Sequence, residues 1–284
     1  MDKKIMLRRM RRSPHFVVGG ILVIFLLFVA VFAKYLAPCD PNAVNTAIRL
    51  KPPGFTDNGI TYILGTDHQG RDILSRLLVG SSASIFISIV ATVAVTIVGT
   101  ALGVWAGYRG GVIDNIVMRA TEVTMAVPTL TLGIVIVAVF GASIPNLILI
   151  MVVNSWNGFA RIARNNVMVI KNREFVQASK VLGAKSFTIM WKQIFPNITT
   201  PLIIQASGSF GSIILVESSL SYLYLGIQAP QPSWGNMIAD CRNFLPVAPW
   251  TVIAPGVALM LAVLGFNLLG DGLRDVLAPK QRHR

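Results

Sequence analysis

Long runs of apolar residues recur along this chain, and they restrict its fold more than any other feature. The first run, from Phe16 to Phe32, contains no charged residue. Runs of roughly 18 or more apolar residues are long enough for a helix to cross the hydrocarbon core of a membrane. Only 13% of all residues are charged, against about 25% in soluble globular proteins. The sequence therefore predicts an all-α integral membrane protein.

The N-terminus combines positive charge with the first apolar run. Six basic residues lie within the first twelve positions: Lys3, Lys4, Arg8, Arg9, Arg11 and Arg12. A cleaved secretory signal has an apolar core of about 7–15 residues, and the run here is longer. We therefore expect a basic tail over residues 1–15 followed by an uncleaved first span. The net charge of +13 gathers at the edges of apolar runs, which argues against nucleic-acid binding.

Six membrane-spanning helices are expected, at 16–34, 83–107, 115–140, 144–161, 198–222 and 248–270. An even number places both termini on one side. All but six of the 25 lysines and arginines then fall on that side, which the positive-inside rule identifies as cytoplasmic. The expected organisation is a cytoplasmic tail (1–15), the first span (16–34), an extracytoplasmic segment (35–80), a transmembrane core (81–271) with a cytoplasmic loop (162–196), and a second cytoplasmic tail (272–284).

The extracytoplasmic segment should be irregular at first, because it contains Pro38, Pro41, Pro52 and Pro53. Near its end, "GTDHQGRDILSRLL" predicts a short amphipathic helix that Asp67 or a neighbour caps. Its apolar face comprises Ile73, Leu74, Leu77 and Leu78. His68 could make a contact, but we interpret it as a solvated loop residue. Cys39 and Cys241 have no metal-binding spacing, and whether they form a disulfide stays open.

The stretch "REFVQASKVLGAKSFTIMWKQIFPN", residues 173–197, is unusually basic for this chain. It is not a phosphate-binding loop, because Ala184 stands where glycine should precede Lys185 and no strand leads into it. Helical spacing of Phe175, Ala178, Val181 and Leu182 predicts a first helix that ends at Gly183. A second helix is expected from Ser186, its N-cap, with an apolar stripe of Phe187, Met190, Trp191 and Ile194. Pro196 should stop this helix, and Asn197 should begin the fifth span.

Two interpretations of this pair of helices remain open. They could rest on lipid headgroups as interfacial helices, or they could form a docking element for a soluble partner. A loop that only connects two spans needs about five polar residues, whereas this one is about thirty residues long.

This loop resembles the coupling loop of ABC importer permeases, whose motif runs E-A-A, three residues, glycine, nine or ten residues, isoleucine-x-proline. Gln177-Ala178-Ser179, Gly183 and Ile194-Phe195-Pro196 match it. The leading acid is absent, and Glu174 lies one turn earlier. The resemblance implies that the ATPase-coupling residues are Glu174, Gln177, Ala178, Ser179, Gly183, Ala184, Ile194 and Pro196.

Two further stretches resemble the C-type permeases of dipeptide, oligopeptide and nickel importers. They are "LGTDHQGRDILSRLL" at 64–78 and the last third from "LSYLYLGIQAPQPSWGNMIAD" onward. The resemblance covers residues 14–279 and adds an extracytoplasmic motif of Gly65, Thr66, Asp67, Gly70, Arg71 and Asp72. It implies a type I permease fold in a bacterial or archaeal plasma membrane. It also implies a second permease, two cytoplasmic ATPases that use ATP and Mg, and an extracytoplasmic substrate-binding protein. The chain itself should be no enzyme and bind no cofactor or metal.

Ionisable residues within spans are costly and often functional. Glu122 and Glu217 are such residues, and each is expected either to pair with an interfacial arginine or backbone group or to line the translocation path. Pro128 should kink the third span. Asp114 and Asp271 are expected to make structural contacts at span edges.

Two rival functions remain. An ion-coupled secondary transporter would show inverted repeats and several buried charges, which the sequence lacks, and an assembly protein without a path would not need the two-helix loop. Short peptides are the commonest cargo of the resembling subfamily, with nickel or another metal chelate and glutathione as alternatives. The chain has no histidine, cysteine or methionine cluster that would indicate a metal path.

Overall fold

A computed structural model describes residues 10–277 of the chain. The long helices are α2 (Pro14–Leu36), α3 (Ile73–Arg109), α4 (Gly111–Ala126), α5 (Thr129–Phe140), α6 (Ile144–Ile170), α9 (Phe195–Tyr222) and α11 (Trp250–Leu277). Shorter helices are α7 (Glu174–Val181), α8 (Ser186–Thr188), α10 (Trp234–Cys241), the 3-10 turns η1 (Thr46–Ile48) and η3 (Arg242–Phe244), and the π-helical turn η2 (Ile189–Ile194). Strands β1 (Phe55–Asp57) and β2 (Ile60–Tyr62) form an antiparallel hairpin in which Phe55 pairs with Tyr62.

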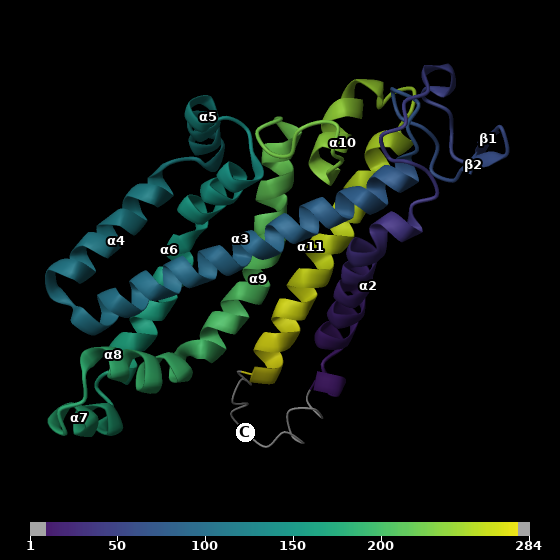
Figure 1. The fold of residues 1–284 in the computed structure, drawn as a ribbon. Coiled ribbons are helices and arrows are strands. Elements are labelled where there is room, and N and C mark those ends of the chain that lie inside the picture. Colours follow the sequence, from purple (N-terminus) through teal and green to yellow (C-terminus); the bar gives the residue numbers. More distant parts are fainter. Residues whose placement is uncertain (1–9, 278–284) are drawn as a thin grey trace.

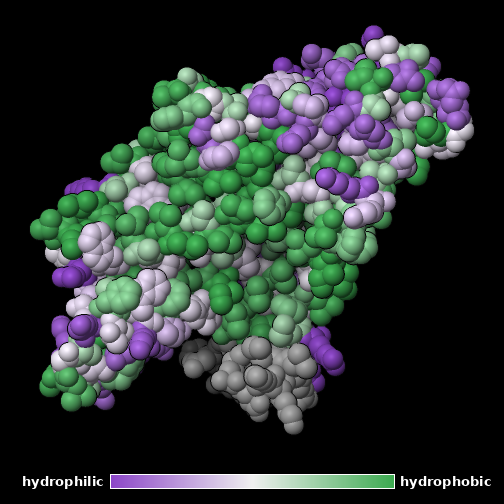
Figure 2. Space-filling view, in the orientation of Figure 1, coloured by the Kyte–Doolittle hydropathy of each residue, from purple (hydrophilic) through white to green (hydrophobic). Residues whose placement is uncertain are grey.

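The helices run between two polar ends (Figure 1). The start of α2, the end of α11 and helices α7 and α8 lie at one end, here called the α7 end. The β1–β2 hairpin and α10 lie at the other, the β1–β2 end. Figure 2 shows a hydrophobic band between these ends, with hydrophilic residues over the hairpin and again around α7. Residues expected to be cytoplasmic thus share one end, although most of the two basic tails (1–9 and 278–284) lies outside the described residues.

Four helices within residues 10–277 are long and apolar enough to cross a membrane. They are α2, α3, α11 and a continuous helix from Ser186 to Tyr222. The bent pair of α4 and α5 adds a fifth if it counts as one span. The remaining expected span is α6, which is 27 residues long but less apolar. The all-α membrane fold is confirmed, and the six-span count stays a prediction.

The short amphipathic helix expected before the second span is not separate. It forms the first turns of α3, a single helix of 37 residues. Asp72 caps this helix, because its Oδ2 accepts a hydrogen bond from Ser75 N at 2.8 Å. Gly80 and Ser81 are buried within the helix where it passes residue Ser233. Small residues allow close packing without ending a helix, so the expected short helix is continuous with the second span. The expected domain boundary at residue 80 stays a prediction.

The third span is broken rather than kinked. α4 and α5 meet at an angle of 93°, with Val127 extended (φ −91°, ψ 120°) and Pro128 directly before α5. A residue before proline avoids the helical conformation, and proline lacks the N–H that would continue the helix. Both effects act at this position, so the chain turns sharply. Figure 1 shows α5 nearly end-on beyond the far end of α4.

Pro196 does not stop the helix that precedes the fifth span. The chain passes through η2 directly into α9, where Pro196 occupies one of the first two positions. The N–H of Phe195 donates to Met190 O, five residues earlier, as in a π-helix. This wider turn accommodates the missing proline N–H without a break. The second loop helix and the fifth span are therefore one rod from Ser186 to Tyr222.

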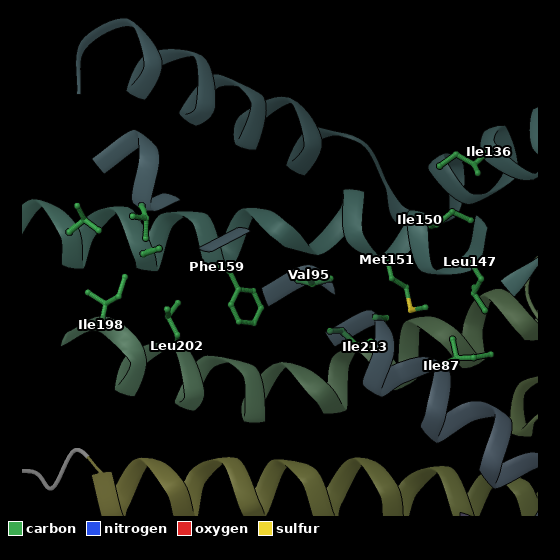
Figure 3. Close-up of a cluster of buried hydrophobic side chains, with 14 of the residues drawn as sticks. Ile87, Val95, Ile136, Leu147, Ile150, Met151, Phe159, Ile198, Leu202 and Ile213 are labelled. Atoms are coloured by element: carbon green, nitrogen blue, oxygen red, sulfur yellow. The ribbon is translucent and has the colours of Figure 1, made fainter. Parts of the chain in front are cut away.

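The main core lies between α3, α6 and α9, and Figure 3 shows Phe159, Met151, Leu202 and Val95 within it. Gly99, Gly103 and Gly107 bring α3 close to α6. A Cβ on Gly107 would lie 2.8 Å from Arg164 O, and the other two would clash with Trp156 O and Ala160 O. Glycine at every fourth position lets two membrane helices approach closely. The α3–α6 pair thus forms a rigid centre to which the two ends attach.

Candidate functional site

The turn after α7 has the geometry of a glycine C-cap. Gly183 adopts a left-handed conformation (φ 78°), and Ala184 N donates to Ser179 O at 3.0 Å. This bond closes the Schellman motif that glycine favours. Gly183 therefore ends the helix as the sequence predicts. Ser186 does not act as the next N-cap, because it is already the first residue of α8 and Lys185 precedes it without a side-chain bond.

Most of the apolar side chains expected on α7 point away from the rest of the chain. Val181 is 87% exposed, Leu182 is 86% exposed, and Phe175 and Ala178 are also exposed. Val176 is the buried residue of this helix. Exposed apolar side chains at an otherwise basic and polar end form a surface that is suited to docking against a partner protein. We call residues Glu174–Leu182 the α7 knob.

Polar bonds fix the α7 knob to the rod that follows it and to the end of α6 that precedes it. Gln193 Nε2 donates to Ser179 Oγ at 2.6 Å, and Gln177 Nε2 donates to Lys171 O at 2.9 Å. Ile194 is completely buried in the main core, and Ala184 packs against that core. Glu174 lies in the exposed first turn of α7, and Pro196 is exposed. Apart from the exposed Pro196 of α9, the coupling-loop residues divide into exposed ones on the knob or in its turn and anchoring ones beneath it.

The extracytoplasmic motif folds into a tight turn around Asp67. Oδ1 of Asp67 accepts from Gln69 N at 2.8 Å and Arg71 N at 3.0 Å. Gly65 and Gly70 both have positive φ, 78° and 75°, which glycine adopts without strain. Thr66 Oγ1 donates to Ile48 O and accepts from Lys51 N. The motif thus ties the preceding loop to the start of α3.

Three buried charges and the partly exposed Asp240 form an ion cluster at the centre of this turn. Asp67 Oδ2 lies 2.7 Å from Arg71 Nε and 3.5 Å from Arg76 Nε. Asp240 of α10 lies 3.4 Å from Arg71 Nη2 and 3.9 Å from Arg76 Nη2. Two positive and two negative charges balance, which keeps their burial tolerable. This ion cluster joins the loop, the start of α3 and α10.

Arg76 and Asp240 were not among the expected site residues. Both lie within quoted stretches of the sequence, and the available signal was that Arg76 interrupts the apolar start of α3. The pairing itself joins residues that are far apart in the chain, so no local pattern indicates it.

His68 is half-buried, so the interpretation as a solvated loop residue is wrong. Its ring stacks on Phe244 with centroids 5.8 Å apart, and Nδ1 lies 3.6 Å from Cys241 Sγ. Cys39 and Cys241 are both free thiols. Burial lowers the pKa of the His68 imidazole below its ordinary value of 6.5, because desolvation disfavours the charged ring.

Lowering the pH is expected to destabilise the protein through His68. The native state keeps the ring neutral, so the unfolded chain binds the proton first as the pH falls below about 6.5. The contribution of the neutral His68 ring to stability is fully present above that pH. It decreases progressively as the pH falls from about 6.5 to the lower native pKa of His68. Thermal melting of the purified protein at several pH values should show this loss, and His68→Gln should show a smaller one. Equal losses in both proteins would assign the effect to another group.

Glu122 and Glu217 have different surroundings. Glu122 is exposed and pairs with Arg119 at 2.8 Å, which matches the expected ion pair with an arginine. Glu217 is completely buried, and its carboxyl accepts from Ser221 Oγ at 2.8 Å and Ser218 Oγ at 3.2 Å. Its partners are serine hydroxyls instead of an arginine or a backbone group, and a role in lining the path stays a prediction.

The two aspartates at span edges also differ. Asp114 forms a bidentate pair with Arg164 of α6 at 2.5 and 2.6 Å, a structural contact as expected. Asp271 is exposed on α11. The Asp114–Arg164 pair fixes the start of α4 to the rigid α3–α6 centre.

Two protein families match the chain. The family described as the binding-protein-dependent transport system inner membrane component matches residues 99–283. The family described as the N-terminal TM domain of oligopeptide transport permease C matches residues 4–53. Together they include both the α7 knob and the first membrane helix.

Curated relatives match over nearly the full length. The chain is 43% identical over 271 residues to the dipeptide transport system permease protein DppC of Escherichia coli K12, covering 95% of this chain and 90% of that protein. It is 38% identical over 275 residues to the protein of the same name from Alkalihalophilus pseudofirmus, covering 97% and 89%. The glutathione transport system permease protein GsiD of Pectobacterium atrosepticum is 37% identical over 273 residues, covering 96% and 89%.

Proposed function

Because this chain belongs to the inner membrane components of binding-protein-dependent transport systems, we propose that it is a permease subunit of an ATP-driven importer of short peptides. The family consists of transport permeases and not enzymes, and the chain is a multi-pass inner-membrane protein. The observation that carries the proposal is the α7 knob, whose exposed Val181 and Leu182 lie at the basic end of the molecule.

The proposed complex contains a homologous second permease, two cytoplasmic ATPases and an extracytoplasmic substrate-binding protein. The ATPases bind ATP and Mg, and this chain binds no cofactor. In this arrangement the α7 end is cytoplasmic and the β1–β2 end is extracytoplasmic, as the distribution of basic residues predicts. The knob sits in a groove on an ATPase as an amphipathic helix.

The path of motion follows from the bonds beneath the knob. Ser179 of α7 accepts a hydrogen bond from Gln193 Nε2 at 2.6 Å, so a displacement of α7 would also move Gln193. Gln193 lies on the rod that runs from Ser186 to Tyr222. The rod crosses to the β1–β2 end, where Gly235 of α10 fits so closely against Ser218 O that a Cβ would clash. A rigid helix can convey a shift at one end to the other. ATP-driven motion of the knob would thereby move α10 and open or close the outer side.

Short peptides are the proposed cargo because relatives named as dipeptide permeases match at 38–43% identity. Glutathione, itself a short peptide, is the second candidate, and the GsiD relative supports it. A nickel or metal-chelate cargo has less support, since the described residues hold no group of three or more histidine, cysteine, aspartate or glutamate side chains suited to a metal. The secondary-transporter alternative predicts no ATPase partner.

Gentle affinity purification of the chain from its native membrane, followed by mass spectrometry, tests the proposal. We expect two ATPases, a second permease and a substrate-binding protein to co-purify, and the binding protein can then be titrated with dipeptides and glutathione. A chain that purifies alone and stably folded would overturn the proposal. The α7 knob would then be assigned to lipid headgroups.

A further inference from the structure

Glu217 is a buried carboxyl near the β1–β2 end of the rod. Its side chain has no exposed surface. Ser221 Oγ donates to its Oε1 at 2.8 Å, and Ser218 Oγ donates to its Oε2 at 3.2 Å. Both serines lie on the same helix, α9, whereas Ser84 of α3 lies within hydrogen-bonding reach of the carboxyl from outside that helix. Glu217 therefore connects the rod to α3.

The surroundings of this carboxyl are polar but uncharged. Within residues 10–277, serine hydroxyls and no charged side chain act on Glu217. Burying a charge without a counter-charge is costly, and ionisable residues within membrane spans commonly mark functional positions. Because its partners are all hydroxyls, Glu217 acts through hydrogen bonds and not as one half of an ion pair.

Ser84 also binds the start of α10. Its Oγ accepts a hydrogen bond from the backbone N–H of Trp234, the first residue of α10, at 3.4 Å. The Trp234 side chain is buried, and its Nε1 donates to Leu77 O of α3 at 3.2 Å. Trp234 thus ties α10 to α3 by two hydrogen bonds, and the hydroxyl of Ser84 stands between α10 and the carboxyl of Glu217.

The rod packs directly against α10 on the other side of the carboxyl. A Cβ on Gly235 would clash with Ser218 O and would lie 2.8 Å from Ser221 Cβ. Ser221 Oγ also accepts from Ile227 N at 3.4 Å, so the loop before α10 bonds to a partner of Glu217. Figure 1 shows α10 beside this end of α9. The rod, α3 and α10 therefore meet around one side chain.

We propose that Glu217 is a positioning residue that holds the rod to α3 and α10, so that ATP-driven displacement of the rod reaches α10. This inference rests on the proposed function. Serine and glycine surfaces alone allow packed helices to slide past each other, whereas directional hydrogen bonds to one carboxyl fix their relative positions. Without that carboxyl, the partner ATPases still hydrolyse ATP, but less of the motion moves α10 and less peptide is imported for each ATP.

Uptake of radiolabelled alanyl-alanine per ATP hydrolysed tests the role of Glu217, with the full purified complex and its binding protein in proteoliposomes. Glu217→Met keeps the size of the side chain but removes both acceptors, and the freed serine hydroxyls can donate to carbonyls one turn earlier. We expect uptake per ATP to fall about tenfold, as for the loss of two hydrogen bonds, while ATP hydrolysis stays at the wild-type level. Glu217→Gln keeps an acceptor and a similar shape, and it should restore uptake per ATP.

A second variant tests the link to α10 without changing Glu217. Ser84→Ala removes the shared hydroxyl, and uptake per ATP should fall roughly fivefold, as expected for one hydrogen bond. Ser88→Ala is the matched control, because Ser88 is buried on the same helix and its Oγ donates to Ser84 O within α3 at 2.7 Å. This control should behave as the wild type does.

Three results would overturn the inference. One is a parallel loss of uptake and ATP hydrolysis in Glu217→Met, which would make the role of Glu217 purely structural. Another is a Glu217→Gln variant as defective as Glu217→Met, since the role would then require a charge. The third is unchanged uptake per ATP in Ser84→Ala, which decides the matter even if Glu217→Met does not assemble. A wild-type complex without ATP-driven uptake would contradict the proposed function itself, and this inference with it, before any substitution is made.

Discussion

Leu182→Asp is expected to abolish ATP-driven uptake while leaving the chain in the membrane at its normal level. Leu182 is 86% exposed at the end of the α7 knob, so the change removes no contact within the chain and should cost little stability. In the proposed complex the same side chain is buried in a groove of an ATPase. An aspartate there would have to lose its hydration without gaining a partner, which strongly weakens association.

Uptake of labelled dipeptide by whole cells measures the loss of transport. The amount of ATPase that co-purifies with the chain measures the loss of association. Leu182→Met is the matched control, because it keeps an apolar side chain of similar size, and it should retain activity. Ala178→Glu and Gly183→Glu should also abolish uptake. The first places a charge on the knob, and the second strains the left-handed turn (φ 78°). Normal uptake by all three acidic variants, at normal expression, would contradict the docking role.

Asp67→Ala is expected to destabilise the protein by about 3–5 kcal/mol, the usual cost of removing one partner from a buried ion pair. The Asp67 carboxylate is 2.7 Å from Arg71 Nε and 3.5 Å from Arg76 Nε, and all three side chains are at least nine-tenths buried. Its loss leaves two buried guanidinium groups with Asp240 as their remaining carboxylate partner in the cluster. The same change removes the acceptor that shapes the turn from Gln69 to Arg71. Thermal melting of the purified protein measures the effect.

Asp240→Ala provides the comparison for Asp67→Ala. The Asp240 side chain is 22% exposed, and its contacts with Arg71 and Arg76 are longer, 3.4 and 3.9 Å. Water can replace part of what Asp240 supplies, so its removal should lower the melting temperature clearly less. Equal effects of the two substitutions would show that the turn does not depend on Asp67 in particular.

The sequence indicates correctly those features that depend on local patterns. Apolar runs mark α2 and α11 because a membrane helix must be apolar along its length. Gly183 marks the end of α7, because only glycine adopts positive φ without strain. Pro128 marks the break in the third span, because proline and the residue before it both disfavour a continuous helix. The angle between α4 and α5, 93°, is larger than the kink that the sequence predicts.

Errors occur where a local signal competes with packing. The stretch "GTDHQGRDILSRLL" suggested a short separate helix, yet α3 continues through Gly80, whose lack of a side chain lets it pass close to Ser233. Pro196 suggested a stop, yet the π-helical turn before it carries the chain onward. His68 suggested a solvated residue, yet Phe244 and Cys241 enclose it. In each case the deciding neighbour is distant in the sequence or is an unusual backbone turn.

The sequence by itself determined the membrane location, the helical class and the position of the α7 knob, because hydropathy, charge asymmetry and helical periodicity are all properties of neighbouring residues. Only the tertiary structure decided that Asp67, Arg71, Arg76 and Asp240 form one ion cluster. This cluster depends on pairs of residues separated by more than 160 positions, such as Arg71 and Asp240. Packing brings such residues together, and no local pattern contains that information.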